Sequence, residues 1–65
     1  MLPNNGDLVR VLTCLTQSQL VYVNQIGEVV SMLRESVNPV LLLRFSDGHE
    51  ELFYTNQVKI EFSRL

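Results

Sequence analysis

The sequence predicts an all-β fold, a small antiparallel barrel of five strands. Apolar and polar residues alternate with a period of two in several short runs, of which Val58-Lys59-Ile60-Glu61-Phe62 is the clearest. Turn residues such as Asp47-Gly48 separate these runs. The 65 residues, 46% of them hydrophobic, suffice for one core but not for two. A single small β-domain accounts for all of these features.

The stretch from Asn24 to Gly48 organises the predicted barrel. It contains two apolar runs, Ile26 to Leu33 and Val40 to Phe45, which we predict to be neighbouring strands. The segment 34–39 between them is polar and ends in Pro39, which disfavours a helical conformation at the residue before it. We therefore expect a turn between two strands here and no long helix.

Alternation along the strands assigns their two faces. In the second run, Leu41, Leu43 and Phe45 share one face, whereas Arg44 lies on the other. Gly27 stands where a strand that enters a tight barrel must bend sharply. The predicted core residues are Val9, Val11, Ile26, Val29, Leu41, Leu43, Phe45, Val58 and Ile60.

The two ends of the chain are predicted to lie outside the barrel. Residues 1–5 form a flexible lead and residues 63–65 a tail, so that the SH3-like barrel spans residues 6–62. The first strand is expected at Leu8 to Leu12, where Arg10 marks the outward face.

The segment after the first strand has two interpretations. From Thr13 to Gln19 the sequence is polar and lacks a strand rhythm, and Leu20 to Val23 is apolar again. This pattern favours a long excursion like the loop between the first two strands of an SH3 barrel. A short helix from Thr16 to Tyr22 is the alternative, because Leu15, Gln19 and Tyr22 would line one helical face. β-Branched residues near the end of that segment disfavour the helix.

The last third of the chain completes the predicted barrel. A strand from Glu50 to Tyr54 follows the Asp47-Gly48 turn, and Thr55-Asn56-Gln57 fits a single 3₁₀ turn before the last strand, Val58 to Phe62. Short strands, a long first loop and tight later turns are typical of a strongly bent antiparallel SH3-like barrel, in which closure removes exposed sheet edges.

Composition limits the classes of partner and compartment. The formal net charge is −2 and the pI is about 5.1, whereas non-specific binding to nucleic acid depends on clustered Lys and Arg. The single cysteine, Cys14, cannot form an internal disulfide and suits a reducing compartment. No apolar run approaches the roughly 20 residues that cross a bilayer, and no signal peptide is evident. We therefore expect a soluble protein of the cytosol or of an organelle interior that is not exported, and its acidity counts against broad attraction to nucleic acid.

Groups that support catalysis are sparse. His49 is the only histidine, and it stands beside Asp47, Glu50 and Glu51 in a turn, where four metal ligands would have poor geometry. We interpret it as a solvated turn residue. Cys14 has no basic neighbour in sequence that would stabilise a thiolate, so an inert, semi-buried thiol is expected. Nucleophile elbows and Gly-rich phosphate loops are absent from the sequence. The sequence predicts no enzyme, no cofactor and no metal site.

The aromatic residues offer an alternative role. Several rings around a cavity could bind a methylated lysine, as tudor-type barrels do, because a cation is attracted to ring faces. Phe45 and either Phe53 or Phe62 are needed for the core, so packing is the favoured interpretation. The aromatic residues concerned are Tyr22, Phe45, Phe53, Tyr54 and Phe62.

The cationic residues indicate a docking surface. Arg10 and Arg44 both lie on outward faces of predicted strands, and Arg34 lies in the turn between the two central strands. Arginine pairs with carboxylates in a bidentate manner, so such a surface would suit an acidic partner protein. We predict that Arg10, Arg34 and Arg44, extended by Tyr54, bind this partner.

From Gly6 to Ile60 the order of motifs resembles that of a known group. The motifs are Gly6-Asp7-Leu8-Val9-Arg10-Val11, then Gln25-Ile26-Gly27-Glu28-Val29, then Val40 to Phe45 with Asp47-Gly48, and then Leu52-Phe53-Tyr54 leading to Val58. They resemble the small SH3-like subunits of photosynthetic electron transport. This group includes PetP of the cyanobacterial cytochrome b6-f complex, PsaE of photosystem I and the variable chain of ferredoxin:thioredoxin reductase. The chain differs from PsaE in its shorter loop before the final strand. It differs from PetP in carrying Thr55-Asn56-Gln57 where PetP usually has acidic residues.

The resemblance implies a non-catalytic accessory or regulatory subunit. Such a subunit binds a larger photosynthetic electron-transfer complex and helps to dock or regulate a soluble partner such as ferredoxin. It would be cytoplasmic, or peripheral on the cytoplasmic (stromal) face of the thylakoid membrane. The alternative from a different class is a KOW- or tudor-type barrel that binds nucleic acid, a ribosome or a peptide, and the acidity of the chain counts against it.

Overall fold

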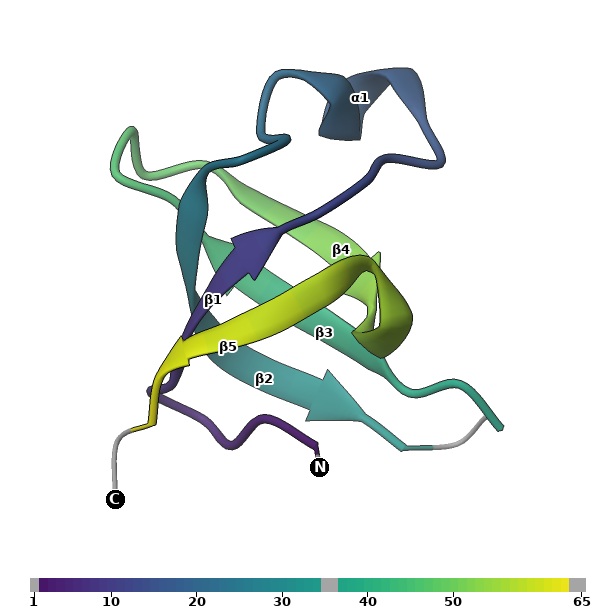
Figure 1. Cartoon of the computed structure of the whole chain (residues 1–65), viewed down its shortest axis with the longest axis vertical. Coiled ribbons are helices and arrows are strands. Elements are labelled where there is room, and N and C mark those ends of the chain that lie inside the picture. The colour runs from purple at the N-terminus through teal and green to yellow at the C-terminus, as the bar shows by residue number, and fades with distance from the viewer. Residues whose placement is uncertain (1, 35–36, 64–65) are drawn as a thin grey trace.

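Five antiparallel strands form a single sheet in the computed structural model, which describes residues 2–34 and 37–63 (Figure 1). The elements in chain order are β1 (Leu8–Val11), α1 (Gln17–Leu20), β2 (Ile26–Leu33), β3 (Val40–Arg44), β4 (Glu50–Tyr54), the 3₁₀ helix η1 (Thr55–Gln57) and β5 (Val58–Phe62). The strand order across the sheet is β4-β3-β2-β1-β5. The predicted all-β, five-stranded antiparallel fold is confirmed.

The sheet coils on itself, and β2 is the strand that turns it. The first residues of β2 pair with β1, as in Val9 opposite Gly27, and its last residues pair with β3, as in Leu33 opposite Val40. The register shifts between Val29 and Ser31, and such an irregularity increases the local twist. As a result β1 and β5 cross the direction of β3 and β4 (Figure 1). Within the described ranges β4 and β5 are not paired with each other, so the closure of the barrel that the sequence predicts is not found.

The core lies between the two halves of the coiled sheet. Six of the nine predicted core residues are buried, and Val58 and Ile60 pack against them while partly exposed. Tyr22 and Phe53 are buried members that the predicted core lacks. The buried hydrophobic residues are Val9, Val11, Tyr22, Val29, Leu41, Leu43, Phe45 and Phe53.

The assignment of Ile26 to the core is wrong. Ile26 is 36% exposed, because it pairs with Arg10 on the outer face of the sheet. Its neighbour Gly27 pairs with the buried Val9 and takes the inward position. A Cβ atom at Gly27 would lie 2.9 Å from Cε1 of Phe45. The glycine is therefore required for close contact with an aromatic ring and not for a special backbone angle, whereas Gly48 does adopt a positive φ of 84° in its turn.

The N-terminal lead folds back onto the sheet. Asn4 N donates to Oδ2 of Asp7 at 2.8 Å, and Asp7 N donates to the carbonyl of Asn4 at 3.0 Å. Gly6 N donates to the carbonyl of Val29 at 2.8 Å, and Pro3 is buried. These contacts attach the start of the chain to β2. Residues 35 and 36 of the predicted turn, and residues 64 and 65 of the predicted tail, lie outside the described part of the chain.

The excursion between β1 and β2 combines both sequence interpretations. It is a long connection that contains one helical turn, α1, shorter than the alternative helix from Thr16 to Tyr22. Gln19 and Tyr22 are buried, as expected for one face of that helix, but Leu15 is exposed. Ser18 Oγ donates to Glu51 Oε2 at 3.0 Å, which attaches α1 to β4.

Two glutamine side chains join the unpaired edge of β4 to the excursion. Gln57 Nε2 donates to Gln19 Oε1 at 2.9 Å and to the carbonyl of Thr13 at 3.1 Å. Gln19 Nε2 donates to the carbonyl of Leu52 at 2.6 Å, and the N–H of Tyr54 donates to Gln57 Oε1 at 2.9 Å. Both backbone groups belong to β4, the edge strand. The amides thus occupy hydrogen-bonding positions that a neighbouring strand would fill in a closed barrel.

We expect Leu43→Ala to destabilise the fold by about 2–5 kcal/mol, because Leu43 is fully buried and the substitution leaves a cavity. Chemical denaturation measures the free energy of unfolding. Leu33→Ala is the matched control, since Leu33 is exposed on the same sheet and should cost less than about 0.5 kcal/mol. Equal losses at the two positions would contradict the assignment of faces.

We expect Gln19→Leu to cost about 1–3 kcal/mol, because it leaves the N–H of Leu15, the carbonyl of Leu52 and one amide of Gln57 without their partner. Gln17→Leu makes the same chemical change at an exposed position of the same helix and should be nearly neutral. Denaturation curves and amide exchange of the excursion test this difference. A neutral Gln19→Leu variant would show that the amide bridge does not hold the excursion.

Candidate partner-binding surface

Arg10 and Arg44 point outward, as alternation predicts, but each is paired with a carboxylate. Arg10 Nε donates to Glu61 Oε1 at 2.5 Å, and Arg10 Nη1 donates to the carbonyl of Asn24 at 2.6 Å. The hydrogen bond from Arg10, with its nearby positive charge, lowers the pKa of Glu61. Arg44 donates through Nε and Nη2 to Glu50 Oε2 at 2.9 and 2.7 Å. Both guanidinium groups are therefore partly neutralised.

The four residues predicted to bind a partner do not form one cluster. Arg44 and Tyr54 lie on the outer face of the adjacent strands β3 and β4. Arg10 is on β1, with β2 between it and Arg44. Arg34 follows β2, is exposed, and lines a depression with Asn4, Asn5 and Met32. It makes no ion pair with any described residue. Their predicted role in binding stays a prediction.

Arg44 and Tyr54 border an apolar surface that the sequence analysis did not identify. We name it the sheet strip. The register places Val40 beside Leu33 and Tyr54, and Leu42 beside Leu52, all on the outer face. Arg44, with Glu28 and Glu50 as its cross-strand neighbours, forms the next row. The members of the sheet strip are Leu33, Val40, Leu42, Leu52 and Tyr54.

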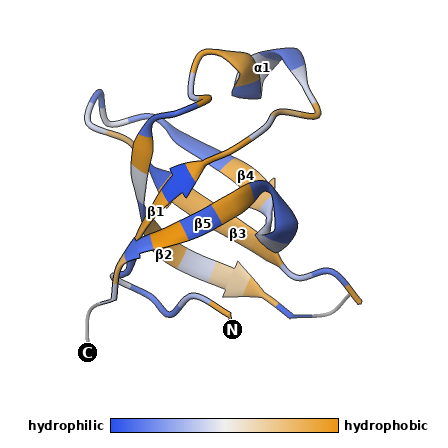
Figure 2. Ribbon diagram, in the orientation of Figure 1, coloured by the Kyte–Doolittle hydropathy of each residue, from blue (hydrophilic) through white to orange (hydrophobic). Residues whose placement is uncertain are grey.

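A second apolar surface lies on the excursion, and we name it the excursion tip. Its members, Leu15, Leu20 and Val21, are 66%, 57% and 68% exposed. Figure 2 shows hydrophobic residues on both sides of α1, where the excursion projects from the sheet. The polar Gln19 between them is 5% exposed. Burial in this segment is therefore inverted, with a polar side chain inside and aliphatic side chains outside.

Sequence reasoning had one available signal for this tip. Residues 12–25 contain no charged side chain, although 18% of the whole chain is charged. Depletion of charge together with exposed apolar residues is characteristic of the central part of protein interfaces. The polar glutamines and threonines of the segment hid this signal, because they favour the interpretation of an ordinary solvated loop.

Tyr22 anchors the excursion to the core. Its ring stacks on Phe45 with centroids 4.1 Å apart and an interplanar angle of 18°. Its O–H donates to Asp47 Oδ2 at 2.9 Å. Burial of the ring, and then this hydrogen bond, raise the pKa of Tyr22. The hydrogen bonds that Asp47 accepts, from the N–H of His49 and from Tyr22, lower the pKa of Asp47.

His49 lies half exposed in its turn, as predicted, but it is also held on several sides. Its ring stacks on Tyr22 with centroids 5.5 Å apart and an interplanar angle of 5°. Its Nε2 lies 3.0 Å from Glu51 Oε1, and its N–H donates to Asp47 Oδ1 at 3.0 Å. The histidine thus joins the turn, β4 and the excursion.

The aromatic residues do not converge on a cage. Phe45 and Phe53 are buried and meet edge to face, with centroids 5.9 Å apart. Tyr54 and Phe62 are exposed on β4 and β5, which are at opposite ends of the sheet order. The packing interpretation is therefore correct for Phe45 and Phe53.

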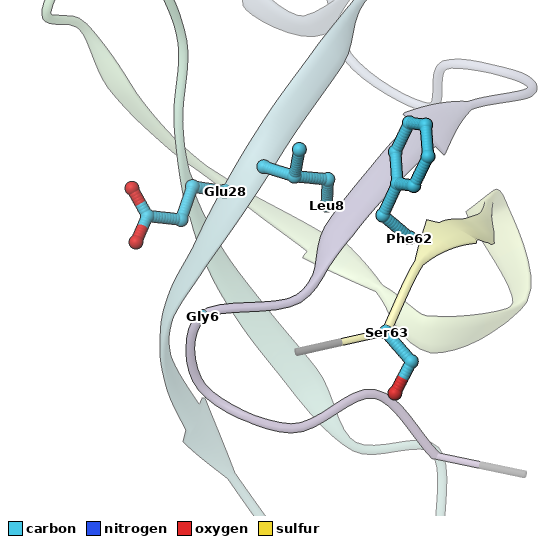
Figure 3. A pocket seen from close by; sticks show the side chains of 5 residues that line it. All are labelled: Gly6, Leu8, Glu28, Phe62 and Ser63. Carbon is cyan, nitrogen blue, oxygen red and sulfur yellow. The ribbon is translucent and has the colours of Figure 1, made fainter. Parts of the chain in front are cut away.

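The depression between the ends of β1 and β5 contains no arrangement of catalytic groups. Leu8 and Phe62 project from the neighbouring strands, whereas the carboxylate of Glu28 points away from them and from Ser63 (Figure 3). Cys14 is half-buried, as expected for a semi-buried thiol. In residues 2–34 and 37–63 no group of His, Cys, Asp and Glu could hold a metal ion. The same ranges include no helix that is long and apolar enough to cross a membrane.

Comparison of the chain with models of protein families, with curated proteins and with solved structures gave no match.

The Tyr22–Asp47 contact predicts a stability loss at alkaline pH. The folded state raises the pKa of Tyr22 above the ordinary tyrosine pKa of 10.0. When the pH rises past 10.0, the phenol is therefore ionised in unfolded chains before it is ionised in folded ones. The free energy of unfolding should therefore fall as the pH rises from 10.0 to the raised pKa of Tyr22 in the folded state. Tyr22→Phe should lack this part of the fall, whereas Tyr54→Phe, the matched control, should retain it. Urea denaturation between about pH 9 and 11 measures the difference, and identical curves for the two variants would contradict the prediction.

Proposed function

We propose that the chain is a non-catalytic accessory subunit that binds a larger electron-transfer complex and helps to dock or regulate a soluble partner. The observation that carries the proposal is the excursion tip, where aliphatic side chains are exposed and a glutamine is buried. The residue types alone predict that the aliphatic side chains are buried and the glutamine is exposed. Departures from such a local expectation concentrate at functional positions. A tip of this kind is suited to binding an apolar region of another protein.

The tip is held firmly enough to act as a binding element. Tyr22 packs it on Phe45, and Gln19 bonds it to β4 and to Gln57. The conformational entropy of the excursion is therefore lost when the chain folds and not when a partner binds, which favours affinity. The leucines and Val21 then meet a partner from a pre-formed loop.

The sheet strip supplies a second contact in this proposal. The strip contains Tyr54 and is bordered by Arg44. The sequence analysis predicts both of these residues to bind a partner. Arg10 and Arg34 are proposed as peripheral charges that steer the approach of an acidic partner. Because Arg10 and Arg44 are already paired with carboxylates, their contribution should be modest and dependent on salt.

The class of partner rests on the sequence resemblance. The motifs between Gly6 and Val58 support a photosynthetic electron-transfer complex as the larger partner, with ferredoxin as the soluble one. In this proposal the chain is cytoplasmic, or peripheral on the cytoplasmic (stromal) face of the thylakoid membrane, as in cyanobacteria. The uncharged tip and the paired arginines favour a protein surface over a phosphate backbone as the bound partner.

The test measures binding of the purified chain to isolated photosynthetic electron-transfer complexes by biolayer interferometry. Val21→Ser should weaken binding roughly tenfold, because it removes an exposed aliphatic side chain from the tip. Val37→Ser makes the same change at a fully exposed position outside both apolar surfaces, and it should bind as wild type does. Arg44→Gln should reduce the salt dependence of association without introducing a like charge beside Glu50.

Two results would contradict the proposal. The first is binding that is unaffected by Val21→Ser. The second is tighter retention on immobilised nucleic acid than on any of the complexes, with a steep salt dependence, which would favour the KOW- or tudor-type alternative.

A further inference from the structure

The N-terminal lead enters β1 through a turn centred on Asn5 and Gly6. The N–H of Asp7 donates to the carbonyl of Asn4 at 3.0 Å and closes this turn. Gly6 adopts a positive φ of 93°, and Asn5 is exposed. The turn therefore presents an asparagine side chain to solvent, directly before a residue that has no Cβ atom.

This pair of residues has the composition that favours deamidation. The main-chain nitrogen that follows an asparagine can attack the Cγ atom of its side-chain amide, because the two atoms close a succinimide ring. Glycine favours the attack, since no Cβ atom shields the nitrogen and the backbone adapts to the ring. Asn5 is the only asparagine of the chain that precedes a glycine. The others, which precede Asn, Gln or Pro, are Asn4, Asn24, Asn38 and Asn56.

A hydrogen bond restrains the attacking nitrogen in the folded chain. The N–H of Gly6 donates to the carbonyl of Val29 at 2.8 Å, so it points towards β2. Attack on Asn5 requires that this N–H leaves Val29 and loses its proton. Chain ends open locally at a smaller free-energy cost than the core does. We therefore expect the reaction from states in which the lead has separated from β2, and its rate should follow how often these states occur.

A second pair of residues that would close the same ring, Asp47 and Gly48, is protected. The two carboxylate oxygens of Asp47 accept from the N–H of His49 at 3.0 Å and from the O–H of Tyr22 at 2.9 Å. These bonds lower the pKa of Asp47, and an ionised carboxylate is a poor electrophile. The N–H of Gly48 donates to the carbonyl of Phe45 at 2.9 Å. Both atoms that would form the ring are thus held.

We propose that Asn5 is a site of spontaneous deamidation, at which a neutral amide becomes a carboxylate. Hydroxide removes the proton of the Gly6 nitrogen, which forms a bond to Cγ of Asn5 while the bond from Cγ to the side-chain nitrogen breaks. That nitrogen takes a proton from water and leaves as ammonia. Water then opens the succinimide at either carbonyl and gives aspartate or isoaspartate. The net reaction consumes water, releases ammonia and needs no oxidant, reductant or cofactor.

The new carboxylate would share a depression with Arg34. Asn5 and Arg34 line this depression together with Asn4 and Met32. Arg34 is exposed and makes no ion pair with any residue in the described ranges. A carboxylate matches the donors of a guanidinium group, so the product of the reaction would supply Arg34 with a partner. Deamidation also adds one negative charge to a chain whose net charge is −2.

The consequence for binding rests on the proposed function, whereas the modification itself does not. Arg34 is one of the peripheral charges proposed to steer an acidic partner. A carboxylate beside it would weaken that attraction, so the modified chain should associate more slowly at low salt.

The first test follows the purified full chain at mildly alkaline pH by mass spectrometry. Trypsin cleaves after Arg10, and fragmentation of the released peptide 1–10 separates Asn4 from Asn5. We expect the mass gain of an amide converted to an acid at Asn5 before any other asparagine, with release of ammonia. Asn5→Gln is the matched variant, because it keeps the amide but lengthens the side chain and disfavours ring closure. The mass gain at this position should then disappear.

The second measurement repeats the incubation in urea that unfolds the chain. The N–H of Gly6 is then free of Val29, and conversion of Asn5 should be about tenfold faster than in the folded chain, because the restraining hydrogen bond is lost.

The third measurement tests the contact with Arg34. Asn5→Asp supplies the product directly, and NMR titration should give its carboxylate a pKa below the ordinary value. Adding Arg34→Gln should raise this pKa. Lys59→Gln is the matched control and should leave the pKa nearly unchanged, because Lys59 is an exposed cation that does not line the depression.

Three results would overturn the proposal. The first is a folded chain that stays unmodified at Asn5 after about ten half-lives of the reaction in urea. The second is equally fast conversion of another asparagine in the folded chain. The third is a carboxylate pKa in Asn5→Asp that Arg34→Gln does not change, which would remove the link to Arg34. None of these measurements involves a partner, so the proposed function is tested separately.

Discussion

The hydrogen bond between the side-chain amides of Gln57 and Gln19 is the contact on which the rest of the structure depends. No strand pairing joins β4 to β5 in the described part of the chain, so the coiled sheet would be open along this line. The two amides satisfy backbone groups of β4, at Leu52 and Tyr54, and of the excursion, at Thr13 and Leu15. Because each donor and acceptor has a partner, the network can be buried at little cost.

The regular elements could be predicted because their signals are local. The limits of β2, β4, η1 and β5 agree with the ranges expected from alternation and turn residues. Gln19 and Gln57 could not be predicted as buried, since their partner lies 38 positions away and nothing local distinguishes them from solvated amides. Ile26 was wrongly assigned to the core, because the inward position belongs to the next residue, Gly27. Alternation from Val29 places Gly27 inward and Ile26 outward, and the error came from preferring the apolar residue to the glycine beside it as the core position.

The same limit applies to the candidate surface. The outward direction of Arg10 and Arg44 follows from period two, but the carboxylates that meet them come from other strands, Glu61 being 51 positions from Arg10. The sheet strip depends on the register of three strands, which a single sequence does not specify. The excursion tip could have been predicted from the sequence, because residues 12–25 contain no charged side chain. The burial of Gln19 and the exposure of the aliphatic side chains could not be predicted, because they depend on the distant partners of Gln19 and Tyr22.

Residues 2 and 63, the first and last that the structure describes, lie opposite α1, along the longest dimension of the molecule, which measures 27 Å (Figure 1). The excursion is therefore the part most remote from any attachment made through a terminus. An affinity tag, a fluorophore or a fused domain at either end would leave the leucines of the tip unobstructed. Immobilised by its ends, the molecule would present the excursion to the solution, and the orientation on a sensor surface would be the same whichever terminus carried the tether.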